Sequence, residues 1–272
     1  MSGDASNPLL AVDGLVLSFG GVSALDGVSF ELAHDELLAI IGPNGAGKTS
    51  IFNCLNQVYR PQTGSIRLAG REIIGLPPYE TAAAGLARTF QNPALFPKLD
   101  VLDNLMVGRH HLMRTGFVSG AWWHGRARRE EQLHRDRCRE VAGLLRLDDD
   151  LSRPVGLLPY GTQKRVELGR ALAMEPRVLL LDEPVAGMNA FERSDMVALL
   201  QELRQRLRLS MLLVEHDMGV VGRLADRVLV LNFGRVIADG TPAGVRADPA
   251  VAEAYLGAGA AAGALLEAVA VP

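Results

Sequence analysis

The sequence predicts an α/β fold with a phosphate-loop core, an antiparallel β subdomain near the N-terminus and an inserted helical subdomain. Three observations predict this fold. Continuous apolar runs at 37–41, 178–181 and 211–214 suit strands of a parallel sheet that is buried on both faces. A glycine-rich loop follows the first run, and acidic or histidine residues follow the other two. Ligands bind at the carboxyl ends of strands in such sheets, so we expect the site there.

Length and composition favour one large domain. The chain has 272 residues, of which 48% are apolar, and a net charge of -3. We expect a single domain over 1–256 and an Ala/Gly-rich tail at 257–272. The near balance of charge gives no sign of a bulk nucleic-acid binder. The two cysteines, Cys54 and Cys138, form no CxxC pair and are typical of a reducing compartment. No apolar stretch reaches the roughly 18 to 20 residues that span a bilayer, so a membrane role would come through partners.

The first elements are predicted to be short strands, followed by a helix. Residues 15–17 and 28–32 have strand character and are separated by Gly-rich turns. After Lys48 the apolar residues recur at helical spacing. The chain is therefore predicted to run from the buried strand at 37–41 through a glycine loop into a helix.

The middle of the chain is predicted to be a helical insertion at about 92–170. Helical spacing recurs at 101–106 and at 133–145, with a loop-like stretch between that contains Trp122 and Trp123. The two tryptophans either cap a local cluster or touch a partner. A further helix is predicted over 163–174, and a hairpin is predicted from the strands 228–231 and 235–238.

Charged residues alternate in sign along the insertion, which favours a salt-bridged helix face, with a docking surface as the alternative. The arginines are Arg126, Arg128, Arg129, Arg135, Arg137 and Arg139, and the acidic residues are Glu130, Glu131, Asp136 and Glu140. Histidines also gather in this region without Cys or carboxylate at ligand spacing, so we expect solvated histidines and no metal site. They are His110, His111, His124 and His134.

The glycine loop matches the pattern GxxxxGK[ST], in which glycines let backbone N–H groups form a cradle for phosphate at a helix N-terminus. Lys48 is predicted to reach the β- and γ-phosphates, and the Thr49 hydroxyl to ligate Mg²⁺. A chance glycine turn is disfavoured because the motif follows a buried strand and opens a helix. The predicted nucleotide-binding residues are Gly42, Pro43, Asn44, Gly45, Ala46, Gly47, Lys48, Thr49 and Ser50.

Two acidic residues end the strand at 178–181. Asp182 is predicted to hold Mg²⁺, directly or through water, and Glu183 to act as general base or to position the attacking water. An acidic strand end that merely faces solvent is common. The phosphate loop upstream favours the functional interpretation here.

Three further short motifs accompany these two. They are Arg88-Thr89-Phe90-Gln91, Leu158-Pro159-Tyr160-Gly161-Thr162-Gln163 and Glu215-His216-Asp217. All five motifs occur in the order found in the ATP-binding subunits of ABC transporters, which the chain resembles over nearly its whole length. Each motif is weak alone, and the ordered set is specific. The resemblance implies a RecA-like core and an ATPase coupled to transport.

The resemblance also implies roles for single residues. Phe19 matches the aromatic residue that stacks on adenine, with a core Phe at a strand end as the competing interpretation. Gln91 matches the glutamine that touches Mg²⁺ and the lytic water and couples the site to the membrane subunits. His216 matches the switch histidine that contacts the γ-phosphate.

The signature segment, 158–163, departs from the family's usual Leu-Ser-Gly-Gly-Gln. Pro159 replaces Ser, so a hydroxyl contact to the γ-phosphate is lost, and Tyr160 replaces Gly. The helix that starts around Gly161 can still aim its N–H groups at phosphate bound by the opposing subunit. With this signature, and with Asn189 a few residues after Glu183, the chain resembles the ATPases of branched-chain amino acid uptake.

That resemblance implies ATP and Mg²⁺ as cofactors and a larger assembly. Two ATPase subunits, identical or paralogous, would sandwich two ATP molecules and drive two transmembrane permease subunits. A periplasmic or extracellular solute-binding protein would act indirectly, and nucleic acid would not be a partner. The chain would lie peripherally at the cytoplasmic face of the cell membrane.

The motifs leave three other functions to consider. Related ATPases could serve another solute, such as urea or another amide, or lipid export. A soluble ABC protein acting on nucleic acid or ribosomes is disfavoured, because such proteins usually carry two ATPase units or long coiled-coil insertions. A P-loop kinase or GTPase is disfavoured because the chain has no Asn-Lys-x-Asp guanine-reading motif.

Overall fold

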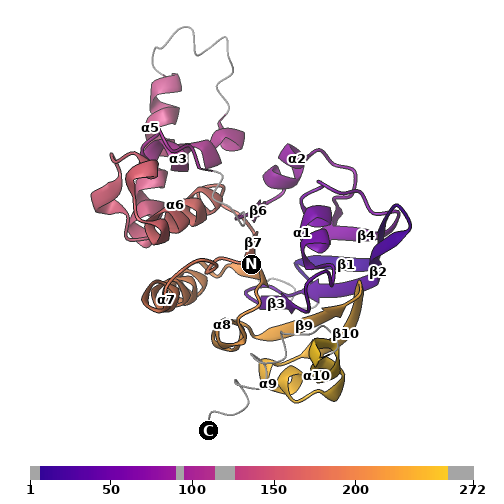
Figure 1. Cartoon of the computed structure of the whole chain (residues 1–272). Coiled ribbons are helices and arrows are strands. Elements are labelled where there is room, and N and C mark those ends of the chain that lie inside the picture. The colour runs from indigo at the N-terminus through magenta and orange to yellow at the C-terminus, as the bar shows by residue number, and fades with distance from the viewer. Residues whose placement is uncertain (1–6, 90–94, 114–125, 257–272) are drawn as a thin grey trace.

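The computed structural model describes residues 7–89, 95–113 and 126–256, which form two sheets and a set of helices (Figure 1). The strands are β1 (Leu10–Phe19), β2 (Val22–Leu32), β3 (Leu37–Ile41), β4 (Thr63–Leu68), β5 (Arg71–Glu72), β6 (Leu86–Arg88), β7 (Val178–Asp182), β8 (Ser210–Val214), β9 (Arg227–Asn232) and β10 (Arg235–Gly240). The helices are α1 (Lys48–Leu55), α2 (Pro78–Ala83), α3 (Val101–Gly108), α5 (Arg126–Leu144), α6 (Tyr160–Leu172), α7 (Ala190–Leu207), α8 (Met218–Leu224), α9 (Pro242–Arg246) and α10 (Pro249–Leu256). The predicted α/β class is confirmed.

The larger sheet carries the three apolar runs that predicted it. Its strand order is β10-β9-β3-β8-β7-β6, with β3, β6, β7, β8 and β9 mutually parallel and β10 antiparallel to β9. All residues of β3, β7 and β8 are buried, as expected for strands covered on both faces. Because Val214 pairs with both Ile40 and Asp182, the carboxyl ends of these three strands lie at one edge of the sheet.

The smaller sheet is antiparallel, in the order β2-β1-β4-β5, which confirms the predicted antiparallel region. Side chains of α1, such as Ile51 and Phe52, share one core with Leu15 of β1 and Ile40 of β3. The helix that follows the glycine loop is therefore packed between the two sheets. That packing fixes the position of its N-terminus at the carboxyl edge of the larger sheet.

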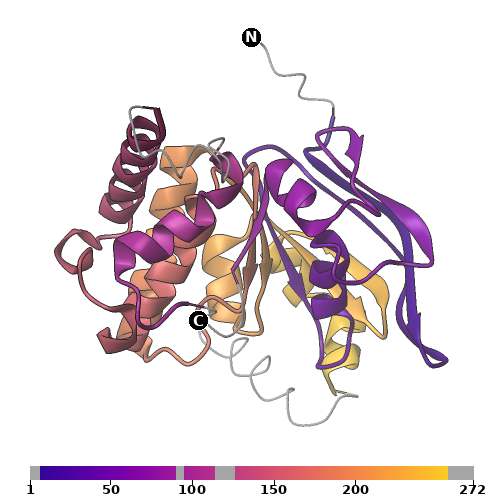
Figure 2. The same cartoon turned by 90° about the horizontal axis from the view of Figure 1, so that it is seen from above.

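Helices α3, α5 and α6 form a helical region, which lies at the opposite end of the molecule from the smaller sheet (Figure 2). A Cβ atom on Gly169 of α6 would lie 2.6 Å from Leu105 Cδ2 and 2.7 Å from Leu145 Cδ1. The side chains of Leu105 and Leu145 would therefore have to move to admit a larger residue at position 169.

The surface of α5 carries the predicted ion pairs, among them Arg135 with Glu131 at 3.0 Å and Arg139 with Asp136 at 2.6 Å. The expectation of solvated histidines is wrong for His134, which is buried and accepts a hydrogen bond of 2.7 Å at Nδ1 from Arg109 Nε. Three residues singled out in the sequence, Trp122, Trp123 and His124, lie outside the described residues, as does the tail at 257–272.

Among the helices that the structure describes, none combines the length and the apolar composition required to cross a bilayer.

Candidate phosphate-binding site

The phosphate loop, Gly42–Thr49, connects β3 to α1 and is shaped by its glycines. Gly42 has φ 147°, and a Cβ atom there would lie 2.1 Å from the carbonyl oxygen of Leu231. Gly47 has φ 107°, and its Cβ would lie 2.5 Å from the carbonyl oxygen of Ala24. Both positions therefore require glycine for conformation and for space. The loop is braced by the turn between β9 and β10, because the Gly234 N–H donates to Ala46 O at 3.0 Å.

Helix α1 begins at the loop without a side-chain cap. Gly47 is the N-cap residue and no side chain hydrogen-bonds to the first turn. The first N–H groups of a helix have no partner inside the helix and carry the positive end of its dipole. This end of α1 therefore suits an anion.

Lys48 places a positive charge inside the same loop. Its Nζ donates to Gly42 O at 2.6 Å and to Pro43 O at 2.9 Å. Burial lowers the pKa of Lys48 below its ordinary value, and the nearby Glu183 carboxylate acts in the opposite direction. The structure thus brings Lys48 and Glu183 together from distant parts of the chain. Lys48 therefore places its charged group against the backbone carbonyls of its own loop.

Asp182 and Thr49 are the predicted metal ligands. Asp182 ends β7 and is 4% exposed, whereas Thr49 is exposed in the first turn of α1. Carboxylate and hydroxyl oxygens are donors that suit Mg²⁺, which keeps water and phosphate oxygens in its shell. The chemistry of these two donors therefore fits the ion. The other oxygen-rich neighbour, Glu183, lies one residue further along the chain.

Glu183 adopts a backbone conformation that is unusual for its residue type. Its φ is 47°, its N–H donates to Val214 O at 2.9 Å, and its carbonyl accepts from the Ala186 N–H at 3.1 Å. A left-handed conformation costs a residue with a side chain of order 1–3 kcal/mol, and such strain clusters at functional sites. The strained residue is also the one whose carboxylate counteracts the effect of burial on the pKa of Lys48.

His216 lies beside Glu183 at the end of β8. Its Nδ1 is 3.9 Å from Glu183 Oε1, and its side chain is 67% exposed. Its backbone N–H donates to Glu215 Oε2 at 3.1 Å, while the Val185 N–H donates to Glu215 Oε1 at 3.4 Å. Burial raises the pKa of the Glu215 carboxyl. Glu215 is missing from the predicted site residues. Its carboxylate nevertheless accepts hydrogen bonds from both turns, the one that carries Glu183 and the one that carries His216.

The signature segment lies in the helical region. Gly161 is in the first turn of α6, which has Pro159 as N-cap and no side-chain cap. The Tyr160 hydroxyl donates to Ala186 O at 3.2 Å, in the turn that follows Glu183. A Cβ on Gly161 would lie 3.0 Å from Glu192 Oε1. The contacts of α6 include those with α3, α5 and β6, which place Gly161 in the helical region.

Two further predicted residues have different outcomes. Phe19 ends β1 and is 48% exposed, so the competing interpretation of a core Phe is wrong. Its ring lies 5.0 Å from the Tyr59 ring at an interplanar angle of 70°. Gln91, predicted as a catalytic and metal-contacting residue, lies outside the described residues.

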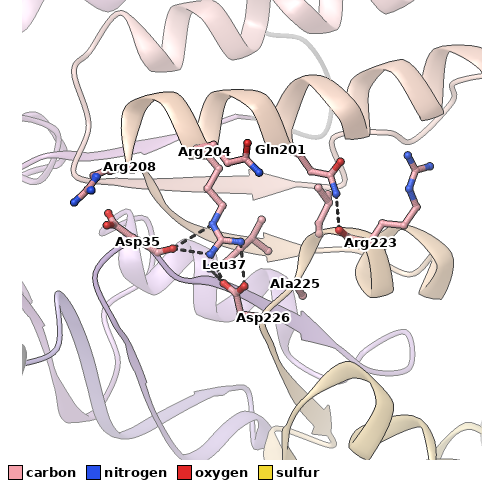
Figure 3. A pocket seen from close by; sticks show the side chains of 10 residues that line it. Asp35, Leu37, Gln201, Arg204, Arg208, Arg223, Ala225 and Asp226 are labelled. Atoms are coloured by element: carbon pink, nitrogen blue, oxygen red, sulfur yellow. Dashed lines mark hydrogen bonds and ion pairs between the residues drawn. The ribbon is translucent and has the colours of Figure 1, made fainter.

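Two hollows of similar size differ in their relation to the site. One, of about 550 Å³, borders the phosphate loop and is lined also by Phe233 and by Glu253 of α10. The other, of about 540 Å³, lies where β3 and β9 begin, at the opposite end of the strands (Figure 3). There Arg204 is already engaged, donating to Asp35 O at 2.7 Å and to Asp226 Oδ1 at 3.1 Å. The first hollow thus touches the phosphate loop from the side of β9, β10 and α10, and Lys48, Asp182 and Glu183 are not among the residues that line it.

Comparison with known proteins agrees with this geometry. The sequence profile of the ABC transporter family matches residues 25–186, and the profile described as branched-chain amino acid ATP-binding cassette transporter matches residues 235–261. The chain is 42% identical over 252 residues to the high-affinity branched-chain amino acid transport ATP-binding protein BraF of Pseudomonas aeruginosa, covering 93% of this chain and 99% of BraF. It is 41% identical, with the same coverage, to the corresponding LivG of Escherichia coli K12.

Solved structures give the same result. One is the ADP conformation of an ATP-binding cassette of an ABC transporter, with a TM-score of 0.80 and 29% identity, covering 93% of this chain and all (100%) of that one. A nucleotide-free ATP-binding cassette matches with a TM-score of 0.80 and 29% identity, covering 92% of this chain and 99% of the other.

Proposed function

Because the chain belongs to the ATP-binding proteins of the ABC transporter family, we propose that it hydrolyses ATP to power uptake of branched-chain amino acids through separate membrane subunits. Relatives that match along almost their whole length are named for branched-chain amino acid transport. The C-terminal match at 235–261, to a family with the same solute in its description, supports the same assignment independently of the phosphate loop.

The observation that carries the ATPase assignment is the meeting of Lys48 and Glu183 at the carboxyl edge of the larger sheet. The N–H groups of the loop and of the first turn of α1 would bind the phosphates, with Lys48 between them. Thr49 and Asp182 would hold Mg²⁺, which neutralises phosphate charge when bound. Glu183 would accept a proton from, or orient, the attacking water, and His216 would contact the γ-phosphate. Phe19 would stack on adenine and Gln91 would contact the ion and the water.

The site is proposed to be completed by a second ATPase subunit. Gly161 lies in the helical region, which would be the inserted subdomain at about 92–170 in a domain spanning 1–256. The uncapped N-terminus of α6 would face the phosphates that the partner subunit binds. The α6 N-terminus of the partner subunit would face the phosphates bound by this chain. Two permease subunits would then place the assembly at the cytoplasmic face of the membrane, with a solute-binding protein acting outside.

Uptake of radiolabelled leucine tests this function in cells that lack the chromosomal copy. The wild-type chain should restore uptake. Lys48→Ala should not, because it removes the charge that reaches the phosphates, and loss of charge-assisted hydrogen bonds of about 1.5–3 kcal/mol each would weaken ATP binding at least tenfold. Lys98→Ala, at an exposed lysine in the same chain, is the matched control and should restore uptake fully. Restoration of urea or lipid transport, with leucine uptake unchanged, would contradict the assigned solute.

A further inference from the structure

Arg88 makes contacts that the proposed mechanism does not use. It ends β6, beside β7, and its Nη2 donates to Asp182 Oδ2 at 2.6 Å. The two side chains are only 9% and 6% exposed. This is a buried ion pair made with the carboxylate that is proposed to hold Mg²⁺.

The same guanidinium also reaches the helix that follows the phosphate loop. Arg88 Nη1 donates to Asn53 Oδ1 at 2.8 Å, and Arg88 Cζ lies 5.5 Å from the centre of the Phe52 ring. Both Asn53 and Phe52 belong to α1. Arg88 therefore connects the end of β7, which carries Asp182, to the helix whose first turn carries Thr49. The planar guanidinium suits this task because it can donate in two directions at once.

A divalent cation at Asp182 would share its ligand with this fixed positive charge. Charges that are almost fully removed from water are screened far less than surface charges. The guanidinium neutralises part of the carboxylate charge and repels a second cation that approaches it. The effect on the ion should therefore depend on the charge of residue 88 more than on its shape.

We propose that Arg88 is a positioning residue that holds the Asp182 carboxylate toward α1 and weakens its affinity for the divalent cation. This inference rests on the proposed role of Asp182 as a metal ligand. A weaker hold on the cation would favour release of the metal with the nucleotide product. An ion pair that only fastens β6 to β7 would instead affect stability and leave metal affinity unchanged.

Binding of Mn²⁺, a paramagnetic substitute for Mg²⁺, separates these roles. Electron paramagnetic resonance would measure Mn²⁺ binding to the purified chain in saturating non-hydrolysable ATP analogue. Arg88→Gln should bind Mn²⁺ about five- to tenfold more tightly than the wild type, because the repelling charge is gone. Arg88→Lys keeps the charge and should stay within about twofold of the wild type. Arg227→Gln is the matched control, since Arg227 pairs with Glu36 at 2.8 Å where β3 and β9 begin, away from the site.

The outcomes distinguish the inference from the proposed function. If the wild type binds no Mn²⁺ with the nucleotide, the proposed metal site is wrong. If the wild type binds Mn²⁺ and Arg88→Gln binds it equally or more weakly, the role of Arg88 is overturned. Removing one partner of a buried pair is destabilising, so circular dichroism melting should accompany each variant. Should Arg88→Gln not fold, a shift in Mn²⁺ affinity beyond about threefold in Arg88→Lys would still overturn the role of the charge.

Discussion

The phosphate loop and the signature segment both present an uncapped helix N-terminus, yet they differ in how strictly the structure fixes their residues. In the loop, Gly42 and Gly47 have positive φ angles, and a Cβ atom added to either would lie 2.1 or 2.5 Å, respectively, from a backbone oxygen. In the signature, the three atoms nearest to a Cβ on Gly161 belong to the flexible Glu192 side chain, and the nearest lies at 3.0 Å. The loop is thus determined by backbone sterics, whereas the signature has tolerated Pro159 and Tyr160 in place of the usual Ser and Gly.

The largest expected effect tests the loop half of this comparison. Gly42→Ala should lower the free energy of unfolding by at least about 3 kcal/mol, because the new Cβ would overlap the Leu231 carbonyl and the φ of 147° would be strained. Gly45→Ala, in the same loop, is the control. Its φ is 81° but no atom lies within 4 Å of its Cβ, so we expect a loss of about 1 kcal/mol. Urea denaturation measures both, and equal losses would refute the steric argument.

An intermediate effect tests the signature half. Gly161→Asp would place a negative charge at the start of α6, where the partner's phosphates are proposed to lie. ATP hydrolysis should fall about a hundredfold, equivalent to roughly 2.7 kcal/mol. Binding of ATP to the isolated subunit should stay unchanged, because the chain's own phosphate loop is intact. Fluorescent nucleotide titration and a phosphate-release assay measure the two quantities. A parallel loss of binding in the monomer would show that Gly161 acts within its own chain.

The smallest expected effect tests the contact between the signature segment and the turn that follows Glu183. Tyr160→Phe removes the hydroxyl that donates to Ala186 O, which lies in the turn after Glu183. One hydrogen bond contributes about 0.5–1.5 kcal/mol, so turnover should fall about two- to tenfold. Tyr79→Phe, at an exposed tyrosine of α2, should leave turnover unaltered. If the two variants have the same turnover, the hydrogen bond from Tyr160 to the turn after Glu183 does not contribute to hydrolysis.

The parts of the site that the sequence predicts are those that depend on local spacing. Glycines at fixed intervals predict the phosphate loop, and acidic residues after apolar runs predict Asp182 and Glu183 at strand ends. The contacts that join distant segments carry no such signal. Arg88 pairs with a residue 94 positions away, and Glu215 is buried beneath two turns that only the fold brings together.

Helix α7 and strand β6 are both absent from the sequence prediction, for different reasons. Helix α7 begins with a capping box in which Asn189 accepts from the Glu192 N–H and Glu192 accepts from the Asn189 N–H. That Asn-x-x-Glu spacing is visible in the sequence. Strand β6 is different, because three residues are too few for a periodic signal and its identity depends on pairing with β7.

The most direct test of the central claim, that two copies of the site close over ATP, is the oligomeric state of Glu183→Gln. This variant keeps the phosphate loop but loses the proposed base, so ATP should bind and persist. Multi-angle light scattering after size-exclusion chromatography should show a dimer of Glu183→Gln with ATP and a monomer with ADP, while hydrolysis falls at least about a hundredfold. Wild-type hydrolysis by this variant, or the same mass with ATP as with ADP, would contradict the account.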